Sequence, residues 1–288
     1  MRVVMLHSRV RVEERMLLDA MERRGVACDV IDVRGEVFDL SDAGRWGEVD
    51  LVLDRSLSLT SSLAAVRTLE AFGVRCVNPS RTTEICSDKL QTSLALERAG
   101  VPTPRVCVAL DQASALEAVE RIGYPAVIKP TVGSWGRLVS RVNDRDAAEA
   151  VIEHRAVLGS AQQQVFYVQE HIDKPGRDLR IFVVGGAAIA GIERRSGHWL
   201  TNTARGATTA GVDVSGEIGE ISARAAACVG GDIVAVDLLE CPQRGLLVNE
   251  INHSMEFRNS VDASGVDIPG LVVEHALGLV GTKAEAPA

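Results

Sequence analysis

The sequence predicts a protein of mixed α/β and α+β class, in which an open parallel α/β unit is followed by two lobes built on antiparallel hairpins. Three observations predict this arrangement. Strands and helices alternate in the first part of the chain. A long apolar stretch, LRIFVVGGAAIAGIERR, turns on Gly185 and Gly186. Near the C-terminal end, the apolar strands IVAVDLLE and LLVNEIN are joined by a turn at residues 242–245.

The first unit is expected to contain four strands with helices between them. Its two helices end before Gly25 and Gly73, because glycine suits the left-handed position that follows a helix. Strand–helix–strand units of this length form parallel sheets. The expected strands are RVVMLH, ACDVIDV, DLVLDRS and VRCVNPS, and the expected helices are residues 12–24 and 60–72.

A helix predicted over residues 87–100, with Ser87 as N-cap and Gly100 just beyond its end, leads into the second unit. Pro102 and Pro104 mark the boundary. A strand, a glycine loop and a returning strand predict an antiparallel hairpin here. The expected elements are a helix over residues 113–122, the strand GYPAVIKP, the loop TVGSWGR, the strand LVSRV and a helix over residues 144–158.

The last unit is expected to begin with the strand FYVQEHI and the loop KPGRDLR, followed by the long hairpin. The polar stretch HWLTNTARGATTAG comes next, and then a helix over residues 217–229 and the two final strands. The chain therefore divides into units of residues 1–86, 87–166 and 167–288.

Composition limits the function classes. The chain has 288 residues, 46% of them hydrophobic, and a formal net charge of −8. An acidic chain is a poor candidate for binding nucleic acid. The longest apolar runs are too short for a membrane span, and the N-terminal run lacks the pattern of a signal peptide. Six scattered cysteines without a CxxC motif predict buried reduced thiols, and with them a cytoplasmic protein.

Oxygen-bearing side chains follow the two final strands. Asp237 ends the first strand, and Glu250 and Asn252 end the second, on one face because their spacing is two. Three such side chains predict a site for Mg²⁺, which prefers oxygen ligands. Two buried carboxylates without a cation would repel each other. The alternative interpretation is a turn that caps a strand.

The glycine loop is the second motif. Lys129 ends a buried strand, and Gly133, Ser134, Trp135 and Gly136 follow. Glycines let backbone N–H groups approach phosphate oxygens, and the lysine can neutralise the same phosphates. Neither a Walker P-loop nor a GxGxxG motif is present. A tight hairpin with a lysine that reaches solvent is the alternative interpretation.

Two further stretches suggest anion or nucleotide contacts. The strand edge at Glu170, His171 and Ile172, with Asp178 and Arg180 in and after the next loop, suits an adenine and a ribose. In the second stretch, Asn202 and Arg205 lie in a long polar loop, where arginine binds phosphate or carboxylate in a bidentate manner. Taken singly, an exposed hairpin corner and a polar loop explain both stretches.

These motifs in this order resemble the ATP-grasp carboxylate–amine ligases, over nearly the whole chain. The resemblance is carried by SDK, KPTVGSWGRL, QEHIDKPGRDLRIFVVG, HWLTNTARGA, AVDLLE, LLVNEINHSMEFRNSV and GVDIPG. It is strongest to the LysX-type ligases of lysine biosynthesis, and RimK-type ligases share the fold and much of the nucleotide site. The resemblance implies an ATP-grasp fold with an N-terminal pre-ATP-grasp domain, and ATP and Mg²⁺ as cofactors.

The resemblance also implies residue roles. Lys89 and Lys129 would bind ATP phosphates, and Gly133 to Gly136 would cover them. The adenine pocket would be lined by Glu170, His171 and Ile172, and Asp178 would meet the ribose. The transferred phosphate and the carboxylate substrate would be held by Arg180, Asn202 and Arg205. The Mg²⁺ ligands would be Asp237, Glu250 and Asn252.

The reaction implied is amide formation, through an acylphosphate, between the γ-carboxylate of the C-terminal glutamate of a small acidic amino-group carrier protein and the α-amino group of 2-aminoadipate. Arg194, Arg195 and Arg258 are expected to guide the acidic carrier. Relatives form dimers or tetramers, which implies a homo-oligomer. The alternatives are a glutamate–carrier ligase, a carrier ligase of specialised metabolism, a RimK-type ligase acting on a ribosomal protein, and a non-catalytic nucleotide-binding regulator.

Overall fold

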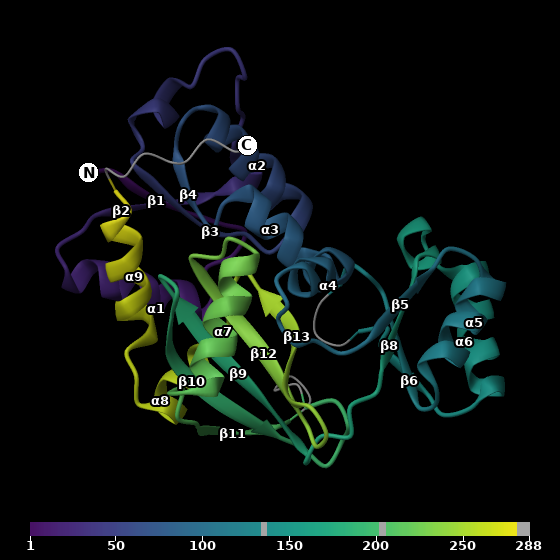
Figure 1. Ribbon diagram of the computed structural model, residues 1–288. Coiled ribbons are helices and arrows are strands. Elements are labelled where there is room, and N and C mark those ends of the chain that lie inside the picture. The colour runs from purple at the N-terminus through teal and green to yellow at the C-terminus, as the bar shows by residue number, and fades with distance from the viewer. Residues whose placement is uncertain (134–136, 202–205, 281–288) are drawn as a thin grey trace.

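The computed structural model describes residues 1–133, 137–201 and 206–280, apart from the side chains of residues 161 and 162. In this part of the chain the strands form three sheets (Figure 1). A parallel sheet comes first in sequence, and two antiparallel sheets follow. The predicted class, an α/β unit followed by two hairpin-based lobes, is confirmed.

The first sheet has the strand order β2-β1-β3-β4 and is parallel throughout. All four predicted strands and both predicted helices of this unit are present. Their bounds are β1 Val3–His7, α1 Val12–Arg23, β2 Cys28–Asp32, β3 Leu51–Arg55, α2 Leu59–Ala71 and β4 Arg75–Val77, with short 3-10 helices at Val33–Gly35 and Gly44–Glu48.

The helix predicted over residues 87–100 is α4 (Lys89–Arg98), and a helix that was not predicted, α3 (Ser80–Ser87), precedes it. The predicted N-cap, Ser87, is wrong. Its hydroxyl donates to the Thr83 carbonyl 2.6 Å away in the last turn of α3. The Asp88 carboxylate accepts from the Leu90 amide instead and caps α4. Neighbouring serine and aspartate are both good caps, so the sequence did not separate them.

The central sheet is antiparallel, with the order β5-β8-β6-β7, and α5 and α6 cover its outer face (Figure 1). We call this sheet with its two helices the central lobe. The predicted boundary after residue 166 divides β8, which pairs with β5 and β6 and so belongs here. The bounds are β5 Val106–Ala109, α5 Gln112–Ile122, β6 Ala126–Lys129, β7 Ser140–Val142, α6 Arg145–Leu158, a 3-10 helix at Ala161–Gln164 and β8 Phe166–Glu170.

The third sheet, which we call the C-terminal sheet, has the order β11-β10-β9-β12-β13. Its two hairpins were predicted, whereas the edge strand β11 and the two last helices were not. β-bulges interrupt both hairpins, one between Ala188 and Ala190 and one between Asp237 and Leu238. The bounds are β9 Arg177–Val184, β10 Ala187–Arg195, β11 Thr208–Gly211, α7 Glu217–Cys228, β12 Ile233–Cys241, β13 Gly245–Asn252, α8 Arg258–Ser264 and α9 Ile268–Gly278.

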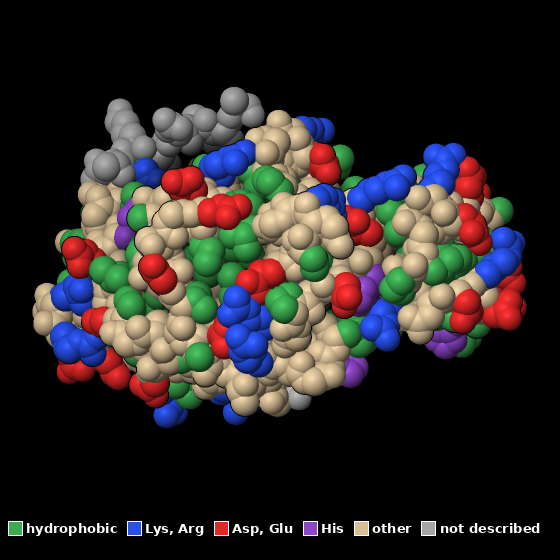
Figure 2. Space-filling model, turned by 60° about the horizontal axis from the view of Figure 1, so that its bottom comes forward, with side chains coloured by type: hydrophobic (Ala, Val, Ile, Leu, Met, Phe, Trp, Pro, Cys, Tyr) green, Lys and Arg blue, Asp and Glu red, His purple; other side chains and the backbone are tan. Residues whose placement is uncertain are grey.

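One hydrophobic core joins the first sheet to the C-terminal sheet. It contains Met5 and Leu17 from the first unit, Phe182 from β9, and Ile268 and Val272 from α9, all buried. Helix α9 packs beside α1, although the two lie at opposite ends of the sequence (Figure 1). The central lobe has a core of its own and projects from this body (Figures 1 and 2).

Charged side chains of both signs are intermingled on the face shown in Figure 2. All six cysteines are free, and Cys28, Cys107 and Cys228 are only partly buried, in contrast to the prediction that every thiol would be buried. Among the described residues, no helix is both long and apolar enough to cross a membrane.

Candidate active site

The first unit, the central lobe and the C-terminal sheet meet around one cleft with a cavity volume of about 930 Å³. Each predicted site residue that the structure describes lines it, although they come from distant parts of the chain. These residues are Lys89, Lys129, Gly133, Glu170, His171, Ile172, Asp178, Arg180, Asp237, Glu250 and Asn252. The other predicted residues, Ser134, Trp135, Gly136, Asn202 and Arg205, lie outside the described residues.

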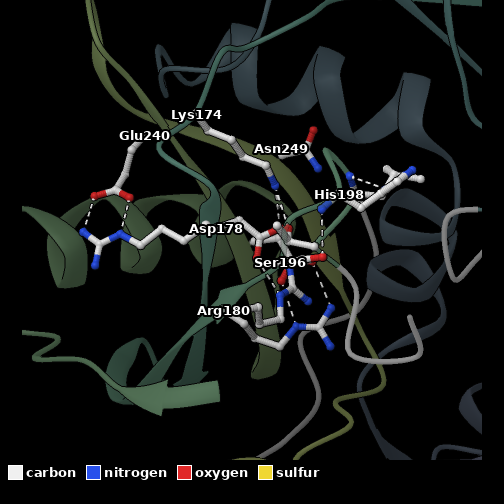
Figure 3. A network of polar contacts seen from close by, with 12 residues as sticks. Lys174, Asp178, Arg180, Ser196, His198, Glu240 and Asn249 are labelled. Atoms are coloured by element: carbon white, nitrogen blue, oxygen red, sulfur yellow. Dashed lines mark hydrogen bonds and ion pairs between the residues drawn. The ribbon is translucent and has the colours of Figure 1, made fainter. Parts of the chain in front are cut away.

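A row of alternating charges, which we call the charge ladder, crosses the C-terminal sheet (Figure 3). Asp178 Oδ1 accepts from Arg194 Nε at 2.6 Å, and Asp178 Oδ2 lies 3.2 Å from Lys174 Nζ. Asp237 accepts from Arg180 Nε and Nη2 at 2.8 and 2.9 Å, and its Oδ2 lies 3.0 Å from Arg194 Nη2. Strand register produces the row, because Arg194 faces Asp178 and Arg180 faces Asp237.

Mutual pairing keeps Asp237 and Arg194 charged. Burial alone would raise the pKa of Asp237, but Arg180 and Arg194 outweigh it and hold that pKa well below its usual range. Burial would likewise lower the pKa of Arg194, and its two carboxylate partners raise it instead. Removing one member would leave a buried charge without a partner, which is costly.

The three predicted metal ligands lie together at the end of the ladder. Asp237 and Glu250 are directly opposite each other in the β12–β13 pair, and Asn252 follows on the face of Glu250. Their oxygens suit a hard cation. The donor set and its grouping therefore fit Mg²⁺.

The electrostatic argument for that ion needs a correction. Carboxylate repulsion was expected to require a cation, yet the two guanidinium groups already compensate Asp237. Glu250 has a more distant cation, Lys89, whose Nζ is 3.9 Å from Glu250 Oε1. The Mg²⁺ assignment therefore rests on ligand chemistry and grouping, and it stays a prediction.

The opposite wall, formed by the central lobe, holds a lysine of a different kind. Lys129 Nζ donates to Gln169 Oε1 at 2.8 Å and to Asn249 Oδ1 at 3.1 Å, and both acceptors are neutral amides. Burial lowers the pKa of Lys129 to about 8, despite an opposing effect of Glu250. A buried ammonium group that meets only neutral oxygens favours the arrival of an anion.

Lys89 lies beside the beginning of the glycine loop. Its Nζ donates to the Gly133 carbonyl at 2.7 Å, and its backbone N–H donates to the Thr131 carbonyl at 2.8 Å. The N-terminal turn of α4 is thereby joined to the loop that follows β6. Gly133 has a φ of +146°, which a side chain would rarely tolerate. Lysine, loop backbone and Lys129 can together surround a phosphate group.

The segment between β8 and β9 forms one end of the cleft. Ile172 packs with Leu239 in a small apolar cluster, which suits a flat heterocycle. The His171 ring lies 6.0 Å from that of Trp199. Burial lowers the pKa of His171, so its neutral form is favoured. Glu170 Oε1 accepts from the Arg105 amide at 2.6 Å and pairs with Arg244.

Several cleft residues were missing from the predicted site. They are Gln169, Lys174, Arg194, Trp199 and Asn249. Asn249 precedes Glu250 in a stretch rich in oxygen-bearing side chains. Only its hydrogen bond with Lys129 shows that it belongs to the cleft. Arg194 was expected to guide an acidic partner at the surface, which is wrong, because its side chain is only 6% exposed and holds two carboxylates.

Comparisons with known proteins agree with this geometry. The family model for the RimK-like ATP-grasp domain matches residues 86–275, and the model for the LysX preATP-grasp domain matches residues 3–85. The chain is 35% identical to the glutamate–LysW ligase ArgX of Sulfurisphaera tokodaii, covering 96% of this chain and 98% of that one. It is 31% identical to the alpha-aminoadipate–LysW ligase LysX of Saccharolobus solfataricus, covering 92% and 97%.

A solved structure shows the same arrangement. The RimK domain ATP-grasp protein of Sphaerobacter thermophilus superposes with a TM-score of 0.80 at 26% identity, over 96% of this chain and 100% of that one.

Proposed function

Because the chain belongs to the RimK-like ATP-grasp family and is thus an ATP-dependent carboxylate–amine ligase, we propose that it ligates an amino acid to a small acidic carrier protein of the LysW type. The amide would join the γ-carboxylate of the carrier's C-terminal glutamate to the α-amino group of 2-aminoadipate. The proposal rests on one observation: two carrier ligases match this chain over more than nine-tenths of its length.

The first half-reaction makes the carboxylate a better acyl donor. A γ-carboxylate oxygen of the carrier attacks the γ-phosphorus of ATP, ADP leaves, and an acylphosphate forms. Lys129 and Lys89 would hold the phosphates, since both amines reach the cleft and neither is committed to a close carboxylate. When bound at Asp237, Glu250 and Asn252, Mg²⁺ would neutralise phosphate charge. Positioning and electrostatics dominate such transfers.

The second half-reaction forms the amide. The amine nitrogen attacks the acylphosphate carbonyl carbon, inorganic phosphate leaves, and the nitrogen loses a proton. Arg180, which lines the cleft, would stabilise the oxyanion in this step. A guanidinium already oriented by Asp237 needs little reorganisation. Water must be kept from the acylphosphate, and a cleft between three parts of the chain would limit its access.

Glutamate is the second candidate for the amine substrate. The ArgX relative, named a glutamate–LysW ligase, is somewhat more similar to this chain than the LysX relative is, at 35% against 31% identity. The two amino acids differ by one methylene group, which a pocket discriminates by only about 1–3 kcal/mol. Direct competition between the two substrates is therefore needed.

The deciding experiment measures phosphate release and the intact mass of a purified LysW carrier, with Mg·ATP and either 2-aminoadipate or glutamate. A mass increase from 2-aminoadipate, matched by one phosphate per amide, is the expected result. An increase from glutamate alone would replace the substrate in the proposal. Phosphate release with neither adduct would mean a different amine, and no reaction would direct the search to a ribosomal-protein tail.

An exposed arginine at the cleft, Arg258, remains a candidate for contact with the acidic carrier. We expect Arg258→Glu to weaken carrier binding at low salt, by roughly tenfold, and to lose most of this effect at high salt because surface charges are screened. Titration of the carrier at two salt concentrations measures this. An unchanged affinity at low salt would exclude Arg258 from the docking surface.

A further inference from the structure

A buried arginine lies behind the wall that carries Lys129. Arg155 belongs to the apolar stripe of α6, with Ile152 and Ala148 one and two turns before it. Only 6% of the residue is exposed. It forms no ion pair with a carboxylate in the described part of the chain, and burial is what lowers its pKa. A guanidinium thus occupies a position where helix packing calls for an aliphatic side chain.

The contacts of Arg155 reach both ends of the hairpin between β6 and β7. Its Nη2 donates to the carbonyl of Ile128 at 3.2 Å and also to the carbonyl of Leu138. Ile128 immediately precedes Lys129, and Leu138 immediately follows Arg137. Both Lys129 and Arg137 line the cleft. One guanidinium therefore fixes the backbone beside two cleft-lining cations.

Leu138 shows that this contact shapes the backbone. Its φ is +56°, in the left-handed region that non-glycine residues rarely adopt. Its side chain is largely exposed and so cannot hold the conformation by packing. The described contact that remains is the hydrogen bond from Arg155 to its carbonyl. The guanidinium therefore holds an unfavourable turn at the end of the glycine loop.

Stability alone does not account for Arg155. An arginine without a carboxylate loses its hydration on burial, and an aliphatic side chain of similar size would pack there without that cost. A second donor group, Nη1, is buried with no acceptor among residues 1–133, 137–201 and 206–280. The contribution of Arg155 must then lie in the backbone geometry that it imposes.

We propose that Arg155 is a positioning residue for nucleotide binding, which holds the backbone at Ile128 and Leu138 so that Lys129 and Arg137 face the phosphates. The inference rests on the phosphate-binding role of this wall in the proposed function. Arg155 itself acts from the helix side of the central sheet, among the residues that pack α6 against β6.

The test uses Arg155→Met and Arg155→Lys, with Arg145→Met as the matched control. Arg145 begins the same helix, but its side chain is 58% exposed and pairs with Glu120 and Glu149. Binding of Mg·ATP and Mg·ADP is measured by titration calorimetry without carrier or amino acid. Thermal unfolding is recorded for each variant, and KM for ATP and kcat are measured in the complete reaction.

We expect Arg155→Met to raise the Kd for Mg·ATP by about tenfold, as for loss of hydrogen bonds made by a charged group. KM for ATP should rise in parallel, and kcat should change less. Arg155→Lys keeps the positive charge but not the planar guanidinium group that reaches both carbonyls. Its Kd for Mg·ATP should therefore lie between those of wild type and Arg155→Met. The control should bind as wild type does.

Wild-type affinity in folded Arg155→Met would overturn the proposal, as would a lower melting temperature with an unchanged Kd. If Arg155→Met fails to fold, Arg155→Lys decides, because wild-type binding by that variant would show that the two-carbonyl contact is unnecessary. Failure of the proposed function is distinguishable. A wild-type chain that binds Mg·ATP but modifies no carrier would refute the carrier-protein substrate and leave the Arg155 measurement valid.

Discussion

The two walls of the cleft carry their positive charges in different ways. On the C-terminal sheet, Arg180 and Arg194 each lie within 3.0 Å of a carboxylate. On the central lobe, Lys129 meets the amide oxygens of Gln169 and Asn249. On the C-terminal sheet, carboxylates compensate both arginines, and we call this side of the cleft the neutralised wall. On the central lobe, the positive charge of Lys129 has no carboxylate close to it among the residues that the structure describes. Under the proposed function, the central lobe would receive the ATP phosphates, and the C-terminal sheet would hold a fixed geometry.

The largest expected effect comes from breaking the neutralised wall. Asp237→Asn keeps the size of the side chain but leaves Arg180 and Arg194 without full compensation. We expect the free energy of unfolding to fall by about 3–5 kcal/mol, as for removing one partner of a buried pair. Phosphate release should also be lost. Denaturant unfolding and a phosphate assay measure both quantities.

Glu240→Gln is the control for that variant. Glu240 is on the same strand and pairs with Arg177, but both side chains are more exposed, at 26% and 29%. We expect a loss of stability of no more than about 1 kcal/mol. If the two variants were equally stable, the charge ladder would not be what holds this wall.

The second prediction contrasts two lysines that line the same cleft. Lys129→Met should raise the Kd for Mg·ATP by about a hundredfold, because charge-assisted contacts to phosphate are strong. Lys174→Met should have a smaller effect, since Lys174 already pairs with Asp178. Titration with Mg·ATP compares them. If both variants lost the same affinity for Mg·ATP, the two walls of the cleft would not differ in how they bind phosphate.

The third prediction concerns pH and the same Lys129. Its pKa is about 8 in the folded chain and about 10.5 when unfolded. Between these values only the unfolded chain keeps the proton, so rising pH favours the folded state. Relative to Lys129→Met, the wild type should gain about 2 kcal/mol of stability between pH 7 and pH 10. Denaturant unfolding at both pH values measures the gain, and a constant difference would contradict the low pKa.

The smallest effect is expected next to the ladder. Arg195 follows Arg194 but is exposed and pairs with Glu193. Arg195→Ala should change the free energy of unfolding by less than about 0.5 kcal/mol, because exposed ion pairs contribute little. If Arg195→Ala lost as much unfolding free energy as Asp237→Asn, the exposed Arg195 would have to be counted as part of the neutralised wall.

Much of the fold follows from sequence periodicity, and the site does so only in part. The parallel strands, the two hairpins and most helices were predictable from apolar spacing and glycines. Helices α3, α8 and α9 were not predicted. Helices α3 and α8 have only eight and seven residues and no side-chain cap, and Gly270 weakens the helical signal of α9. Ser87 was assigned as a cap that Asp88 supplies.

The two bulges explain why the positions of Arg194 and Asn249 were not predicted from the sequence. A regular hairpin turning on Gly185 and Gly186 would place Arg194 opposite Arg177, whereas the bulge near Ala188 places it opposite Asp178. The second bulge places Glu250 opposite Asp237 and leaves Asn249 free to reach Lys129. A shift of one residue exchanges the two faces of a strand, and periodicity alone does not reveal it.

The core shared by the first sheet and α9 has a consequence for synthesis of the chain. The apolar face of β1 and β3 is completed by residues from β9, β12 and α9, which are all synthesised after the first sheet. The N-terminal strands must wait, partly uncovered, until Val272 and Val273 have been made. A nascent chain stalled before α9 would therefore expose the very surface on which chaperones act.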